Sequence, residues 1–113
     1  MAAGYQELFI EQGTTFNTTI TLDDVNGDAF DLTGVTPKAQ VRKSYYSANA
    51  SANFDVTIPI PTNGLISLTL NAPATSNLKP GRYVYDVVIK DSANTVTRVL
   101  EGTVNVVPQV TRF

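Results

Sequence analysis

The sequence predicts a single all-β domain, folded as an antiparallel β-sandwich of about seven to eight strands. Three observations support this prediction: short segments of alternating apolar and polar residues, turn signals roughly every 8–12 residues, and no amphipathic helix of useful length. The 113 residues suit one domain. We expect that domain to span residues 1–113, with short extended tails at 1–5 and 108–113.

The first half of the chain is expected to form three strands and a tight turn. A short strand covers residues 6–11, and a second covers 16–22, where apolar and polar residues alternate. Asn26-Gly27 follows and is a strong hairpin signal, because both residues tolerate positive φ. A third strand over 37–43 leads into an uncharged, Ser-, Ala- and Asn-rich loop over 44–53.

The second half continues the alternation up to Pro108. Residues 54–60 alternate again, but Pro59 and Pro61 indicate an edge strand or an early end, because proline cannot donate to a strand ladder. The later elements expected are a strand at 66–70, a connection with one helical turn at 72–79, a strand at 83–89 and a long strand or strand pair at 96–107.

Four residues define the fold most sharply: Leu78, Pro80, Gly81 and Tyr83. Pro80-Gly81 predicts a tight turn, Leu78 can close the end of the core, and the Tyr83 hydroxyl can bond back to upstream backbone. The segment resembles the tyrosine corner of Ig-like and fibronectin-type sandwiches. The chain has neither Cys nor Trp, so the predicted Ig-like domain has no disulfide.

A wider resemblance covers almost the whole chain, which is similar to the Ig-like domains of tailed-phage virion proteins. The motifs are QG-x-x-F, D-x-x-G-x-x-x-DLTG, A-x-(V/I)-R, PG-x-Y and V-x-P-x-VTR. In this sequence they fall at Gln12, Gly13 and Phe16; Asp24, Gly27 and 31–34; Ala39, Val41 and Arg42; Pro80, Gly81 and Tyr83; and 107–112.

The resemblance implies a structural role in the virion. We expect a protein–protein interaction module in the neck, tail or baseplate, slightly preferred over head decoration. Its partners would be other virion structural proteins, with self-association a further option. It would be made in the host cytoplasm and would need no signal peptide, since none is recognisable after Met1.

Composition argues against several other classes. The net charge of −2, without a block of like charge, gives no reason to expect nucleic acid or membrane as a partner. His and Cys are both absent, which removes the commonest general base and the thiolate nucleophile. Asp86 and Glu101 fit ion pairs with Arg82 or Arg98 better than a catalytic pair. We therefore expect no enzyme and no cofactor.

Acidic residues cluster around the Asn26-Gly27 turn and could supply oxygen ligands to calcium. However, Ala29 stands where an EF-hand loop needs glycine, and no glutamate closes such a loop. We therefore favour an acidic hairpin turn and expect no metal. The cluster comprises Asp23, Asp24, Asn26, Asp28 and Asp31.

The candidate interaction surface combines basic and aromatic residues. Tyr and Arg are enriched at protein–protein hot spots, so we prefer a protein interface. A carbohydrate- or host-receptor-binding module is the alternative, and a plain strand end with frayed tails also fits the residues. The residues are Arg42, Lys43, Tyr45 and Tyr46 beside the 44–53 loop, and Tyr5 and Phe113 in the tails.

Overall fold

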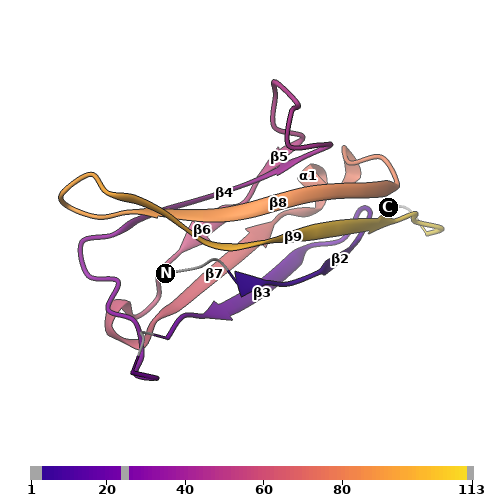
Figure 1. The fold of residues 1–113 in the computed structure, drawn as a ribbon. Coiled ribbons are helices and arrows are strands. Elements are labelled where there is room, and N and C mark those ends of the chain that lie inside the picture. The colour runs from indigo at the N-terminus through magenta and orange to yellow at the C-terminus, as the bar shows by residue number, and fades with distance from the viewer. Residues whose placement is uncertain (1–3, 24–25, 112–113) are drawn as a thin grey trace.

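A computed structural model describes residues 4–23 and 26–111, which form two β-sheets packed face to face (Figure 1). Two short helices lie between strands: the 3-10 helix η1 (Pro61–Asn63) and α1 (Ala72–Ser76). The strands are β1 (Gly4–Tyr5), β2 (Leu8–Glu11), β3 (Phe16–Thr21), β4 (Thr36–Arg42), β5 (Ala52–Asn53), β6 (Asp55–Thr57), β7 (Leu65–Leu70), β8 (Gly81–Lys90) and β9 (Val96–Val107).

The larger sheet has the order β1-β9-β8-β4-β5, and β2 also pairs with β9. β1 and β2 run parallel to β9, whereas the other pairs in this sheet are antiparallel. The smaller sheet has the order β3-β7-β6 and is antiparallel throughout. The chain is therefore an all-β Ig-like sandwich, as its alternation predicts. Neither helix in the described part of the chain has the length and apolar character needed to cross a membrane.

Most expected strands are confirmed with small shifts at their ends, and the helical turn forms as α1. Two differences matter. Gly4–Tyr5 is paired with β9, so this part of the expected N-terminal tail belongs to the sheet. Of the strand expected over 54–60, only Asp55–Thr57 forms, at the edge of the smaller sheet.

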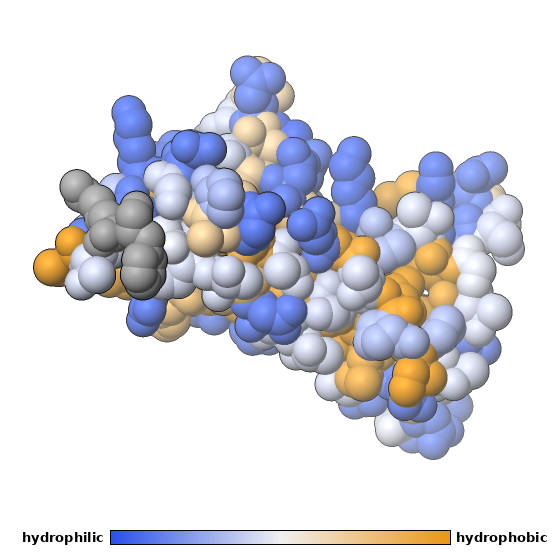
Figure 2. Space-filling model, turned by 180° about the vertical axis from the view of Figure 1, so that it is seen from behind, coloured by the Kyte–Doolittle hydropathy of each residue, from blue (hydrophilic) through white to orange (hydrophobic). Residues whose placement is uncertain are grey.

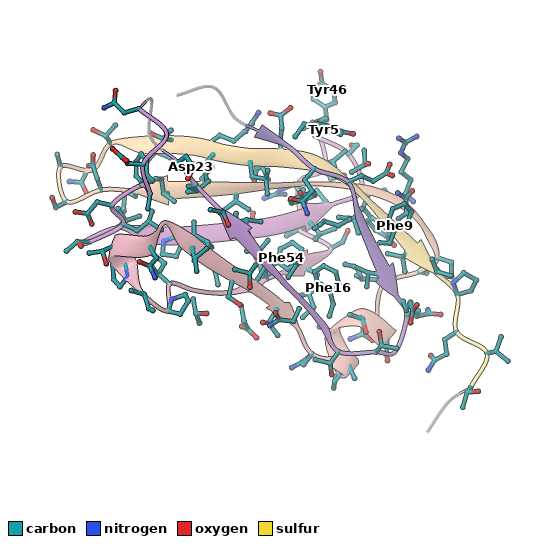
Figure 3. The ribbon with its side chains drawn as sticks, turned by 90° about the horizontal axis from the view of Figure 1, so that it is seen from below. Tyr5, Phe9, Phe16, Asp23, Tyr46 and Phe54 are labelled. Carbon is teal, nitrogen blue, oxygen red and sulfur yellow. The ribbon has the colours of Figure 1, made fainter. Side chains whose placement is uncertain are left out.

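Phe54 explains the second difference, because the chain changes sheets there. β5 before it pairs with β4 in the larger sheet, and β6 after it pairs with β7 in the smaller one. The buried Phe54 ring lies 6.2 Å from the rings of both Phe16 and Tyr85. Figure 3 shows Phe16 and Phe54 side by side between the sheets. The crossing aromatic therefore joins the two layers of the core.

The tyrosine corner forms as predicted. The buried Tyr83 donates a 2.7 Å hydrogen bond from its hydroxyl to the carbonyl of Lys79. Leu78 is buried, and its carbonyl accepts a hydrogen bond from Gln12 Nε2 at 3.0 Å. Gly81 has a φ of 144°, a conformation that side chains disfavour. The turn therefore fixes where β8 begins.

Candidate functional site

A row of side chains crosses the outer face of the larger sheet, by which we mean the face that points away from the smaller sheet. The strand register places Tyr5 beside Glu101, Glu101 beside Asp86, and Asp86 beside Gln40. Asn53 ends the row, and its Oδ1 accepts a 2.8 Å hydrogen bond from Gln40 Nε2. Residues far apart in sequence thus meet in one line.

Arg98 binds both carboxylates of this row. Its Nε lies 3.3 Å from Asp86 Oδ2, and its Nη1 lies 3.0 Å from Glu101 Oε2. The hydrogen bond to Glu101, followed by attraction to Asp86, raises the pKa of the Arg98 guanidinium. The prediction that these acids pair with an arginine is confirmed, and the arginine is Arg98.

A β-bulge in β9 brings Arg98 to this face. Val99 and Leu100 are both buried, and the β8–β9 register shifts beside them. Side chains alternate along a regular strand, so an extra residue reverses the faces taken on either side of it. Strict alternation along β9 would place Val99 on the same face as Glu101, but the bulge leaves Val99 buried.

A shallow pocket of about 130 Å³ opens beside the ion pairs. Its lining combines an aromatic ring with guanidinium, carboxylate and amide groups, which together can stack on a flat ligand and hydrogen-bond to its rim. The lining residues are Gln40, Arg42, Tyr45, Val84, Tyr85, Asp86 and Arg98.

Arg42 positions the loop that follows β4. Its Nη1 donates to the carbonyl of Ser47 at 2.9 Å, and its Nη2 donates to Gln40 Oε1 at 3.0 Å. Within the loop, the amide of Ser44 donates to Ser47 Oγ at 3.1 Å. These bonds fold the loop back so that Tyr45 lines the pocket.

Lys43 does not line this pocket. Its Nζ lies 4.6 Å from the centre of the Tyr83 ring and donates to the carbonyl of Arg82 at 3.2 Å. The ammonium group of Lys43 therefore packs against the tyrosine corner. Phe113, the remaining candidate from the C-terminal tail, lies outside the described residues.

Four aromatic side chains of the larger-sheet strands and the 44–53 loop are exposed to solvent. Tyr46 is 97% exposed, Tyr5 65%, Phe9 62% and Tyr45 58%. Figure 3 shows Tyr5 and Tyr46 on the larger-sheet side, away from Phe16 and Phe54. Phe9 was missed by the sequence analysis, although its place between two buried residues of β2 marks it as outward-facing.

The acidic cluster behaves as a turn in its described part. Asp23 and Ala29 form an antiparallel bridge, which confirms that the chain reverses there. Asp31 Oδ1 accepts hydrogen bonds from the hydroxyl and amide of Thr33, and these lower the pKa of Asp31. Asp24 lies outside the described residues. Among residues 4–23 and 26–111, no three Asp or Glu side chains are grouped to hold a metal ion.

Comparison with known proteins finds solved structures of similar fold but no related sequence. No family model matches the sequence, and no curated protein sequence matches it either. CopC from Methylosinus trichosporium OB3b is similar with a TM-score of 0.49 and 13% identity, over 100% of this chain and 91% of that one. The Lin-41 filamin domain is similar with a TM-score of 0.43 and 17% identity, over 80% of this chain and 81% of that one.

Proposed function

We propose that this chain is a structural protein of a tailed-phage particle that binds other virion proteins through the outer face of its larger sheet. A place in the neck, tail or baseplate is preferred over head decoration. The phage setting rests on the motifs described above, and the choice of surface rests on the side chains of the outer face.

The exposed aromatic rings around the ion-pair row are the observation that carries the binding role. Tyr5 lies beside Glu101, and Tyr45 lines one pocket with Asp86 and Arg98, the residues of the ion-pair network. Phe9 is exposed farther along the same sheet, opposite Asn105 on β9. Protein interfaces are enriched in aromatic residues and arginine, with charged groups paired or at the rim. A surface of this composition suits a protein partner better than a nucleic acid, because it lacks excess positive charge.

A second apolar region lies at one end of the sandwich. Figure 2 shows apolar atoms gathered near the end that holds η1, whereas much of the same view is polar. Ile60 is exposed there, and Phe30, Val35 and Ile58 are only partly buried. Exposed apolar patches commonly mark interaction sites, so this end is a further contact in an assembled particle.

Purified particles test the proposal. Mass spectrometry of virions should detect the protein, and image reconstruction should place it on the tail axis rather than on the capsid lattice. Particles assembled with Phe9→Ala or Tyr5→Ala should incorporate less of the protein. Thr57→Ala is a control, since Thr57 is an exposed residue of β6 in the smaller sheet and lies away from the outer face of the larger one. Absence of the protein from particles would refute the role.

Carbohydrate or host-receptor binding is a second candidate, favoured by the pocket beside Tyr45. The ring and the polar groups of Gln40, Asp86 and Arg98 line one depression, a combination that suits stacking and hydrogen bonding to a sugar. Glycan-array binding that is lost in Tyr45→Ala and kept in Tyr46→Ala would support it, because Tyr46 does not line the pocket. Absence of binding to any glycan would count against it.

A further inference from the structure

The strand β3 has an open edge. Within the described part of the chain it pairs only with β7, through a continuous register from Phe16 opposite Leu70 to Thr21 opposite Leu65. The N-terminal strands β1 and β2 pair with β9 in the other sheet, so the second side of β3 has no strand partner among the described residues (Figure 1).

The hydrogen-bond pattern shows which backbone groups of β3 face outward. The amide of Leu22 donates to Gly64 at 2.8 Å, so Leu22 points its amide toward β7. Alternation along the strand turns the backbone groups of Thr21, Thr19 and Asn17 the other way. The side-chain amide of Asn17 donates a 2.7 Å hydrogen bond to the hydroxyl of Thr69, its partner on β7. Side chains approach this closely in antiparallel pairs that exchange no backbone hydrogen bonds, as expected if the backbone groups of Asn17 face outward.

The other sheet edges carry features that discourage pairing. β6 has three residues and is followed closely by Pro59 and Pro61. The outer side of β4 is covered in part by β5 and by the amide of Phe54, which donates to Ala39. β2 is four residues long and ends in Glu11. Proline, charge and short length are the usual protections of an edge strand.

β3 has none of these protections. Its six residues, FNTTIT, include no proline and no charge, and its pairing with β7 contains no bulge. Asn17, Thr19 and Thr21 are exposed along one face of it. It is therefore the edge best suited to accept another strand.

We propose that β3 pairs antiparallel with β3 of a second copy of this chain. A two-fold axis at Thr19 places Thr19 opposite its own equivalent and Asn17 opposite Thr21, all of them residues with outward-facing backbone groups. The strand is neutral, so self-pairing brings no like charges together, and Thr–Thr pairs are favourable across strands. The contact is symmetric and closes as a dimer, in which the two smaller sheets become one.

This dimer is independent of the phage assignment and of the outer face, because β3 belongs to the opposite sheet. An extended segment of a different protein is the competing occupant of the same edge. A neutral strand that is complementary to itself favours the second copy.

Sedimentation equilibrium of the purified chain tests the proposal. The wild type should dimerise as concentration rises, and Thr19→Lys should weaken dimerisation by about tenfold or more, since it sets two like charges opposite each other. Thr57→Lys is the matched control: Thr57 and Thr19 both lie opposite Ser67, at the two edges of the same sheet. It should dimerise like the wild type.

Cross-linking gives a second readout that does not depend on a destabilising charge. The chain has no cysteine, so Thr19→Cys introduces a single thiol that should form an intermolecular disulfide readily, and Thr57→Cys should not. A wild type that stays monomeric at all concentrations overturns the proposal. So does equal weakening by Thr57→Lys, or cross-linking of Thr57→Cys as fast as Thr19→Cys. A monomer that captures a foreign strand at β3 identifies the competing occupant and also overturns it.

Discussion

The Tyr85 hydroxyl donates a 2.7 Å hydrogen bond to the carbonyl oxygen of Gln6, the residue that follows β1. The amide of Gln6 in turn donates to the carbonyl of Glu101 at 3.0 Å. Tyr85 is paired with Gly102 on β9, and the carbonyl of Gln6 passes directly over that glycine. The N-terminal strands, with Tyr5 and Phe9, are therefore held in place by backbone contacts that need a residue without a side chain.

Gly102→Ala should detach the N-terminal segment from β9. A Cβ at this position would collide with the backbone carbonyl of Gln6, which cannot move aside without breaking its hydrogen bonds. We expect a loss of about 1–3 kcal/mol in the free energy of unfolding, measured by urea denaturation, with faster amide exchange over β1 and β2. Gly4→Ala is a control, because a Cβ at Gly4 meets its nearest atoms at ordinary contact distances of 3.5 and 3.8 Å and the φ of Gly4 is not positive. Equal exchange rates in β1 and β2 of the wild type and Gly102→Ala would contradict this account.

Alkaline pH should weaken the fold through Tyr85. Burial, followed by the nearby Tyr5, raises the pKa of Tyr85 to about 12 from the ordinary value of 10.0. The folded state thus keeps a proton that the unfolded state releases, so the stabilisation is complete below pH 10 and is lost as pH rises toward about 12. In urea denaturation across this range, stability should fall more steeply for the wild type than for Tyr85→Phe. Tyr46→Phe should follow the wild type, and a Tyr85→Phe curve parallel to the wild type would disprove the linkage.

The fold class follows from the sequence because alternation and turn signals are local properties. The corner from Leu78 to Tyr83 is also local, and its hydrogen bond spans only four residues. The site is different in kind. It depends on register across the strands that bring Tyr5 beside Glu101 and Asp86, and on a bulge that turns Arg98 outward. Neither the register nor the bulge can be read from the local residue pattern. For the same reason the sequence groups Lys43 with Tyr45, although Lys43 packs on the Tyr83 ring and Tyr45 lines the pocket.

Tyr83→Phe should test the corner that begins β8. The substitution keeps the ring and removes the 2.7 Å hydrogen bond to Lys79, which leaves a partly buried carbonyl without its partner. We expect a loss of about 1–3 kcal/mol in the free energy of unfolding, measured by chemical denaturation. Tyr46→Phe removes a hydroxyl from a fully exposed ring and should change stability by less than about 0.5 kcal/mol. Equal effects of the two variants would show that the corner bond has no special role.

Arg98→Gln should reveal the repulsion between the carboxylates of Asp86 and Glu101, which Arg98 neutralises. Asp86 and Glu101 lie directly opposite each other on β8 and β9, and like charges in that position destabilise a strand pair. We expect a small loss of stability at low salt that shrinks as ionic strength screens the two carboxylates. Adding Glu101→Gln should restore most of it, because one charge of the repelling pair is then gone. Denaturation of the single and double variants at low and high salt measures both effects. A loss that salt leaves unchanged, and that Glu101→Gln does not reverse, would mean that Arg98 acts through packing of its side chain instead.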